Sequence, residues 1–117
     1  MLASFIDTIR DGNAIAPQRM AGALGLPMTD LARLAHVNRN TLSSKPRLPS
    51  VQEGLGLVAR IIARASELAG GDDRAILWFR HQPIAGFGGS TAEELVVAGH
   101  GRAVIDYLEA LDAGSYA

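Results

Sequence analysis

The sequence contains no cysteine, few aromatic residues and no long apolar run. None of its 117 residues is Cys, and Phe, Trp and Tyr together make up 5%. The absence of Cys excludes disulfide frameworks, Cys-based zinc sites and thiol nucleophiles, and it fits a reducing compartment. No apolar run approaches the roughly 20 residues that span a bilayer, and the opening MLASFIDTIRDGN carries acids where a signal peptide would be basic. We therefore expect a soluble, cytoplasmic protein with no membrane partner.

What the sequence does contain favours helices. Apolar residues make up 48% of the chain, enough for a real core in one compact domain or two very small ones. Ala, Leu and Arg are plentiful and β-branched residues are scattered, so local propensity leans toward helix along most of the length. The sequence predicts an all-α protein.

The net charge of −1 is unevenly spread along the chain. Residues 1–50 hold six basic and three acidic side chains (+3), and residues 51–117 hold five basic and nine acidic ones (−4). The charged residues of 31–50 are all basic. If the protein binds DNA, this stretch is the expected contact.

Apolar spacing, glycine stops and capping residues predict eight helices. The segment PRLPS at 46–50 is the clearest linker, because prolines disfavour helix in the residues before them. Asp72 is expected to cap one helix, and Thr91 with Glu94 fits a capping box. We place the domain boundary at the linker, giving an N-terminal domain 1–49 and a C-terminal helical bundle 50–117. The expected helices cover 2–11, 18–24, 29–35, 39–45, 51–69, 73–81, 91–99 and 101–113.

The segment MTDLARLAHVNRNTLSSK has the spacing of a helix-turn-helix. Two closely crossing helices need a small residue in the first helix, an apolar one after the turn and another in the second. Ala32, Val37 and Leu42 occupy these offsets. His36 replaces the usual turn glycine, and His is among the residues that better tolerate a positive φ. Asn38 would cap the second helix.

That second helix would then present a polar, acid-free face to DNA. Such side chains pair with base edges or phosphate, and a single copy offers too few cations for tight binding. We therefore expect a homodimer on a palindromic double-stranded operator. The alternative is a solvated polar helix in an ordinary bundle. The candidate DNA-binding residues are Arg39, Asn40, Thr41, Ser43, Ser44, Lys45 and Arg47.

The last third reads WFRHQPIAGFGGSTAEELVVAGHGRAVIDYLEALDAGSYA and resembles the C-terminal toxin-binding domain of ParS- and MbcA-like Xre antitoxins. The family usually has Leu before the glycine pair and Pro after the Thr, where this chain has Phe87 and Ala92. The resemblance implies an Xre/Cro-like helix-turn-helix upstream, a homodimer formed through this domain and a RES-domain toxin that consumes NAD as partner. It further implies that a C-terminal tail reaches the toxin's active site; the tail residues are Gly114, Ser115, Tyr116 and Ala117.

Together these observations predict a non-enzymatic type II antitoxin that neutralises its toxin by direct binding and represses its own operon. The alternative is a stand-alone helix-turn-helix regulator whose C-terminal domain only dimerises, and a degenerate helix-turn-helix is also open. An enzyme is poorly supported, since no nucleophile, base and orienting group can be assembled. The three histidines lack metal-ligand spacing, so no metal and no cofactor is expected.

Overall fold

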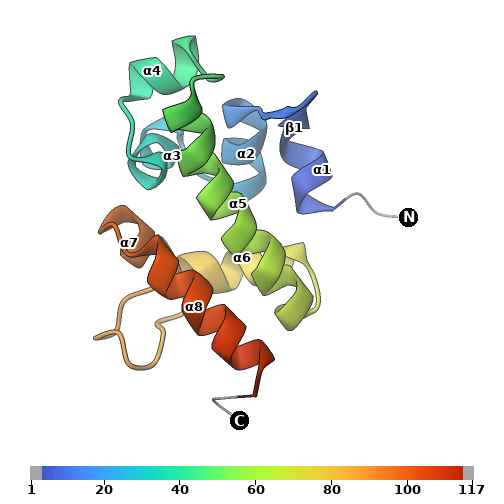
Figure 1. Cartoon of the computed structure of the whole chain (residues 1–117), viewed down its shortest axis with the longest axis vertical. Helices are drawn as coiled ribbons and strands as arrows, with labels where there is room; N and C mark the ends of the chain where they lie inside the picture. The colour runs from blue at the N-terminus through green and yellow to red at the C-terminus, as the bar shows by residue number, and fades with distance from the viewer. Residues whose placement is uncertain (1–3, 115–117) are drawn as a thin grey trace. The chain divides into compact units, whose positions relative to one another are not determined.

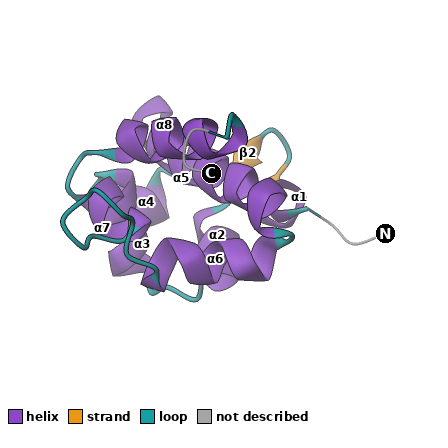
Figure 2. Ribbon diagram, turned by 90° about the horizontal axis from the view of Figure 1, so that it is seen from below, coloured by secondary structure: helices purple, strands orange, loops and turns teal. Residues whose placement is uncertain are grey.

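The computed structural model describes residues 4–114 and divides the chain into two compact units, Met1–Ala59 and Arg60–Ala117. Helices make up nearly all of the regular structure (Figure 2), which confirms the all-α prediction apart from one short hairpin. No helix of residues 4–114 is long and apolar enough to cross a membrane. The elements run in the order α1 (Phe5–Ile9), β1 (Arg10–Asp11), β2 (Ala14–Ile15), α2 (Pro17–Leu24), α3 (Met28–Ala35), α4 (Arg39–Ser44), α5 (Pro49–Ala69), α6 (Asp72–His81), α7 (Ala92–Val97) and α8 (Gly101–Asp112) (Figure 1).

The first unit opens with a helix that is shorter than predicted. The expected helix over 2–11 begins at Phe5 in the structure and ends at Ile9, and the chain then forms the antiparallel hairpin of β1 and β2. Gly12 occupies the first central position of the turn with a φ of 66°, a conformation that glycine adopts without strain. Gly12 is therefore the turn of a hairpin and not the stop of a helix.

Helices α2, α3 and α4 begin and end within one residue of the predicted positions. Pro17 starts α2 at a position where its missing N–H costs nothing, and Gly25 ends it in the left-handed conformation. His36 ends α3 with φ 57° and ψ 40°, and the N–H of Val37 then bonds the carbonyl of Ala32 at 3.1 Å. The Asn38 side chain accepts a 2.7 Å hydrogen bond from the N–H of Asn40 at the start of α4.

The start of α5 closes the core of the first unit. Gly54 lies directly against the end of α3, since a Cβ built on it would stand 2.3 Å from the carbonyl oxygen of Ala35. Only glycine allows this approach. The fully buried side chains of this unit include Ile9, Met20, Leu24, Leu31, Leu34, Leu42, Val51, Leu55 and Val58.

The proline-rich segment predicted as a linker is short in the structure, because α5 already begins at Pro49. The two compact units meet at residues 59 and 60, inside this 21-residue helix. The functional division into 1–49 and 50–117 stays a prediction.

In the second unit, the end of α5 turns into α6 at Gly70 and Gly71. Both glycine N–H groups bond the carbonyl of Ser66 at 3.0 Å. Asp72 does not cap α6 as predicted: Gly71 holds the cap position, and the Asp72 carboxylate accepts a 2.6 Å hydrogen bond from the Ser66 hydroxyl. The carboxylate thus joins two helices at their corner, and it still lies in the first turn of α6, where the helix dipole favours negative charge.

Helix α7 begins with the predicted capping box. The Thr91 hydroxyl accepts from the N–H of Glu94 at 3.1 Å, and the Glu94 carboxylate accepts from the N–H of Thr91 at 2.9 Å. Helix α8 follows after Gly99 and packs against the same core. The most buried apolar side chains of the unit include Ile61, Ile62, Ala75, Phe79, Ala92, Val96 and Val104.

Candidate functional site

The first candidate surface is α4, which is fixed at both ends. At its start, the left-handed turn at His36 and the Asn38 cap set its direction. In its middle, Leu42 is fully buried in the core. Past its end, the Gln52 side-chain N–H donates to the carbonyl of Pro46 at 2.8 Å. The helix is therefore held as a rigid platform for its exposed side.

Gln52 also ties this region to the hairpin. Its amide oxygen accepts from the N–H of Ile15 at 2.9 Å, and its amide nitrogen donates to the carbonyl of Ile15 at 3.0 Å. One half-buried side chain thus satisfies three backbone groups from two segments. Sequence reasoning missed it, because nothing local marks a glutamine whose partners lie 37 residues away.

The seven predicted DNA-binding residues do not all remain available. Thr41 is half-buried, and the Ser44 hydroxyl donates to the carbonyl of Asn40 at 2.7 Å within α4. The Arg47 guanidinium bonds the Asn13 side chain at 3.1 Å and so braces the hairpin turn. The exposed side chains that make no hydrogen bond or ion pair within residues 4–114 are Arg39, Asn40, Ser43 and Lys45.

The second candidate surface is built on the loop and helices after Ala69. Pro83 and Thr91 pair across the loop 82–91 as an antiparallel bridge, and the Ile84 N–H bonds the Ser90 carbonyl at 2.9 Å. The Phe87 ring meets Tyr107 of α8 edge-to-face, with centroids 6.2 Å apart. The loop, drawn in orange in Figure 1, is therefore pinned at its base and at its tip.

Within the second unit, Arg64 connects α5 to the last turns of α8. Its guanidinium contacts Glu109 at 2.9 Å and Asp112 at 2.6 Å, and Glu67 lies on its own helix at 3.3 Å. Hydrogen bonds to Glu109 and then to Asp112 raise the pKa of the Arg64 guanidinium above its ordinary value. The structure thus gives this arginine three acidic partners.

The predicted tail residues can be placed only at their start. Gly114 is exposed just after α8, where a φ of 79° ends the helix. Ser115, Tyr116 and Ala117 lie outside the described residues.

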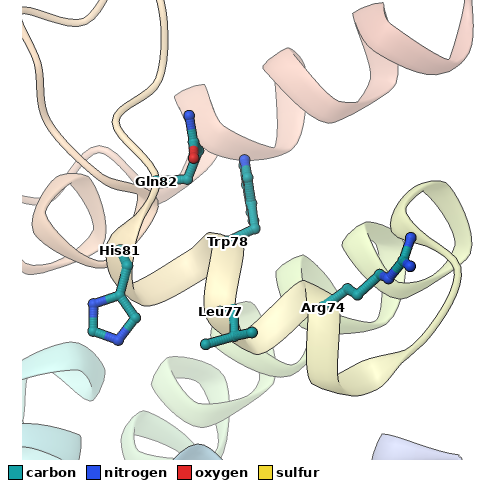
Figure 3. A pocket seen from close by; sticks show the side chains of 5 residues that line it. All are labelled: Arg74, Leu77, Trp78, His81 and Gln82. Carbon is teal, nitrogen blue, oxygen red and sulfur yellow. The ribbon is translucent and has the colours of Figure 1, made fainter.

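The outer side of α6 carries a surface that the sequence did not single out. An open cavity of about 470 Å³ is lined by one helix and the residue after it (Figure 3). Leu77 is 61% exposed, more than any other large apolar side chain of residues 4–114. Trp78 is half-buried at the cavity wall. We name the lining residues the α6 patch: Arg74, Leu77, Trp78, His81 and Gln82.

Among residues 4–114, no three His, Asp or Glu side chains gather as metal ligands would. Helix α4 and the α6 patch each present polar side chains from a helix whose other side is buried in the core.

The second unit matches a known protein family. Residues 64–114 match the family described as antitoxin Xre/MbcA/ParS C-terminal toxin-binding domain. The matched segment contains the pinned loop, the α6 patch and the Arg64 ion pairs. Neither a curated protein nor a solved structure matches the chain.

Proposed function

Because residues 64–114 belong to the Xre/MbcA/ParS family of antitoxin toxin-binding domains, we propose that this chain neutralises a RES-type, NAD-consuming toxin by direct binding. The family match carries this proposal. The type of toxin is inferred from the resemblance of the last third of the chain to ParS- and MbcA-like antitoxins. The antitoxin acts in the cytoplasm as a binding protein, without catalysis and without a cofactor. Its tail from Gly114 to Ala117 reaches the toxin's active site.

Co-expression tests this function. The protein encoded beside this gene, which the proposal expects to be a RES-domain toxin, is expressed alone, with the full chain, and with a chain lacking Ser115 to Ala117, and cellular NAD is measured. We expect NAD to fall with the toxin alone, to be preserved by the full chain and to fall again with the truncated chain. Continued protection by the truncated chain would show that the tail is not the inhibitory element. Failure of the full chain to protect or to bind would remove the antitoxin function.

We also propose that α4 is the recognition helix of an operon autorepressor. Support comes from its exposed, acid-free face, its fixed ends and the left-handed turn at His36 that joins it to α3. Arg39 can pair bidentately with a guanine and Asn40 with an adenine, and Lys45 can contact phosphate. A homodimer would place two such helices about one DNA turn apart on a palindrome.

Operator binding tests this second role. Arg39→Ala should weaken binding to the promoter fragment by about 10- to 100-fold, because a bidentate base contact contributes about 1–3 kcal/mol. Toxin binding should be unchanged. Arg102→Ala is the matched control, since it removes an exposed, unpaired arginine from α8. If Arg39→Ala represses normally, α4 is not the reading helix. A chain that binds the operator but no toxin would instead be a stand-alone regulator.

A further inference from the structure

We propose that the α6 patch is a docking site for the toxin and that it takes an apolar side chain flanked by a carboxylate. This inference rests on the proposed antitoxin function. It names a part of the matched domain, besides the tail, that would contact the toxin. It is carried by three properties of the patch: its apolar centre, its unpaired donors and its lack of acids.

The apolar centre is held out to solvent by the way α6 packs. Ala75 and Phe79 are fully buried, so one side of the helix is fixed in the core. Arg80 adds a 3.5 Å ion pair to Glu93 of α7. Leu77 lies on the opposite side and gains less than half of the stabilisation that full burial would give, because 61% of its surface stays in water. Exposed apolar surface that is rimmed by polar groups, as Leu77 and Trp78 are by Arg74 and Gln82, is typical of a protein-interaction site.

The polar groups around Leu77 are donors without acceptors. The Arg74 guanidinium, the Trp78 indole N–H and the Gln82 amide make no side-chain hydrogen bond or ion pair within residues 4–114. Figure 3 shows Trp78 and Gln82 leaving one edge of α6, with Leu77 and His81 toward the other. Trp and Arg are the residues that most often dominate binding energy at protein interfaces.

The charge of the patch selects the partner. No carboxylate lines the cavity, whereas Arg74 and His81 do. A second copy seated on the same patch about a two-fold axis would bring basic groups against basic groups, with no acid in the lining to separate them. A toxin segment that presents a carboxylate beside an apolar side chain would complement both the basic groups and the apolar centre of the α6 patch.

The apolar surface continues past Trp78, whose ring also borders a second groove of about 170 Å³ between the end of α5 and α8. Leu68 lies on the rim of this groove and is 38% exposed. The patch can therefore accept an extended contact and not only a single side chain. The groove residues are Ala65, Leu68, Ala69, Trp78, Leu108 and Leu111.

The test uses the full chain and the protein encoded beside its gene, which the proposed function expects to be a RES-domain toxin. The dissociation constant is measured at two salt concentrations. Leu77→Asp should weaken binding at least about tenfold, as expected for an interface anchor. Arg74→Glu should weaken it by a similar factor and reduce its salt dependence. Two control variants should bind normally. Leu48→Asp changes another exposed leucine, which lies outside the matched segment, and Arg102→Glu changes an exposed arginine on α8. Unchanged circular dichroism verifies folding of all four variants.

Each outcome of these measurements either supports or overturns the proposed docking site. Wild-type affinity in both α6 variants would overturn it and leave the antitoxin function standing. A change in the mass of the free protein for Leu77→Asp, with normal toxin affinity, would show that the patch joins two copies of the chain. If the wild-type chain does not bind the toxin at all, the docking site and the proposed function both fail.

Discussion

Replacement of Gly54 by Ala tests the close approach of α5 to the end of α3. The added Cβ would stand 2.3 Å from the carbonyl oxygen of Ala35, while ordinary contacts begin near 3.4 Å. The two helices must therefore separate by about 1 Å at this point, because the obstacle is backbone and cannot rotate away. Overpacking of this kind costs about 1–3 kcal/mol, whereas the helix-propensity gain from Gly to Ala is only about 0.5–1 kcal/mol. The strain wins.

Gly56, two residues further along α5, is the matched control. A Cβ there has nothing within 4 Å, so Gly56→Ala should keep the propensity gain alone. We expect urea unfolding followed by circular dichroism to show a loss of about 1–2 kcal/mol for Gly54→Ala and a gain of up to about 1 kcal/mol for Gly56→Ala. In thermal unfolding each kcal/mol corresponds to about 4–8 °C for a unit of this size.

Gly54→Ala should also affect the proposed binding of α4 to DNA. Ala35 is the last residue of α3 and precedes the left-handed turn at His36, so displacing it moves the start of α4. Gly54→Ala should therefore weaken operator binding, and Gly56→Ala should not. Equal stabilisation by both substitutions would refute the close approach of α5 to α3.

Three further substitutions test single contacts. Gln52→Glu removes both N–H donors and sets a carboxylate against two backbone carbonyls, so it should cost about 2–3 kcal/mol in urea unfolding, while Glu53→Gln beside it should be neutral. Thr91→Ala should cost about 1 kcal/mol of stability by removing the cap of α7, and Ser at this position should restore it; no loss would contradict the capping box. Phe87→Leu should cost about 1 kcal/mol in thermal unfolding, because Leu lacks the edge-to-face contact with Tyr107.

Features governed by local rules could be predicted from the sequence. The capping box at Thr91, the Asn38 cap and the Gly25 stop depend on residues within one turn of the chain, and the structure has all three. The spacing of the helix pair predicted that His36 occupies the turn position that needs a positive φ, and His36 has the left-handed conformation in the structure. Helix existence was equally readable, since each long segment repeats its apolar residues at helical spacing.

Features that depend on contacts distant in sequence could not be read in this way. The strands of the hairpin have two residues each, too few for any alternation to show. The carboxylate of Asp72 had two possible partners, the start of its own helix or the Ser66 hydroxyl, and only packing of the corner decides between them. The α6 patch was missed for a related reason: only the burial of Ala75 and Phe79 fixes which side of α6 faces inward.

Basic side chains show most clearly what the charge pattern alone leaves open. Six of them in residues 1–50 gave that half of the chain a charge of +3 and indicated DNA. In the structure Arg19 bonds the carbonyl of Arg10, Arg33 pairs with an acid on its own helix, and Arg47 braces the hairpin turn. Arg39 and Lys45 alone remain unpaired in and beside α4. Because affinity for DNA rises with the number of phosphates neutralised, so small a set in one copy makes a second copy necessary for the proposed operator binding.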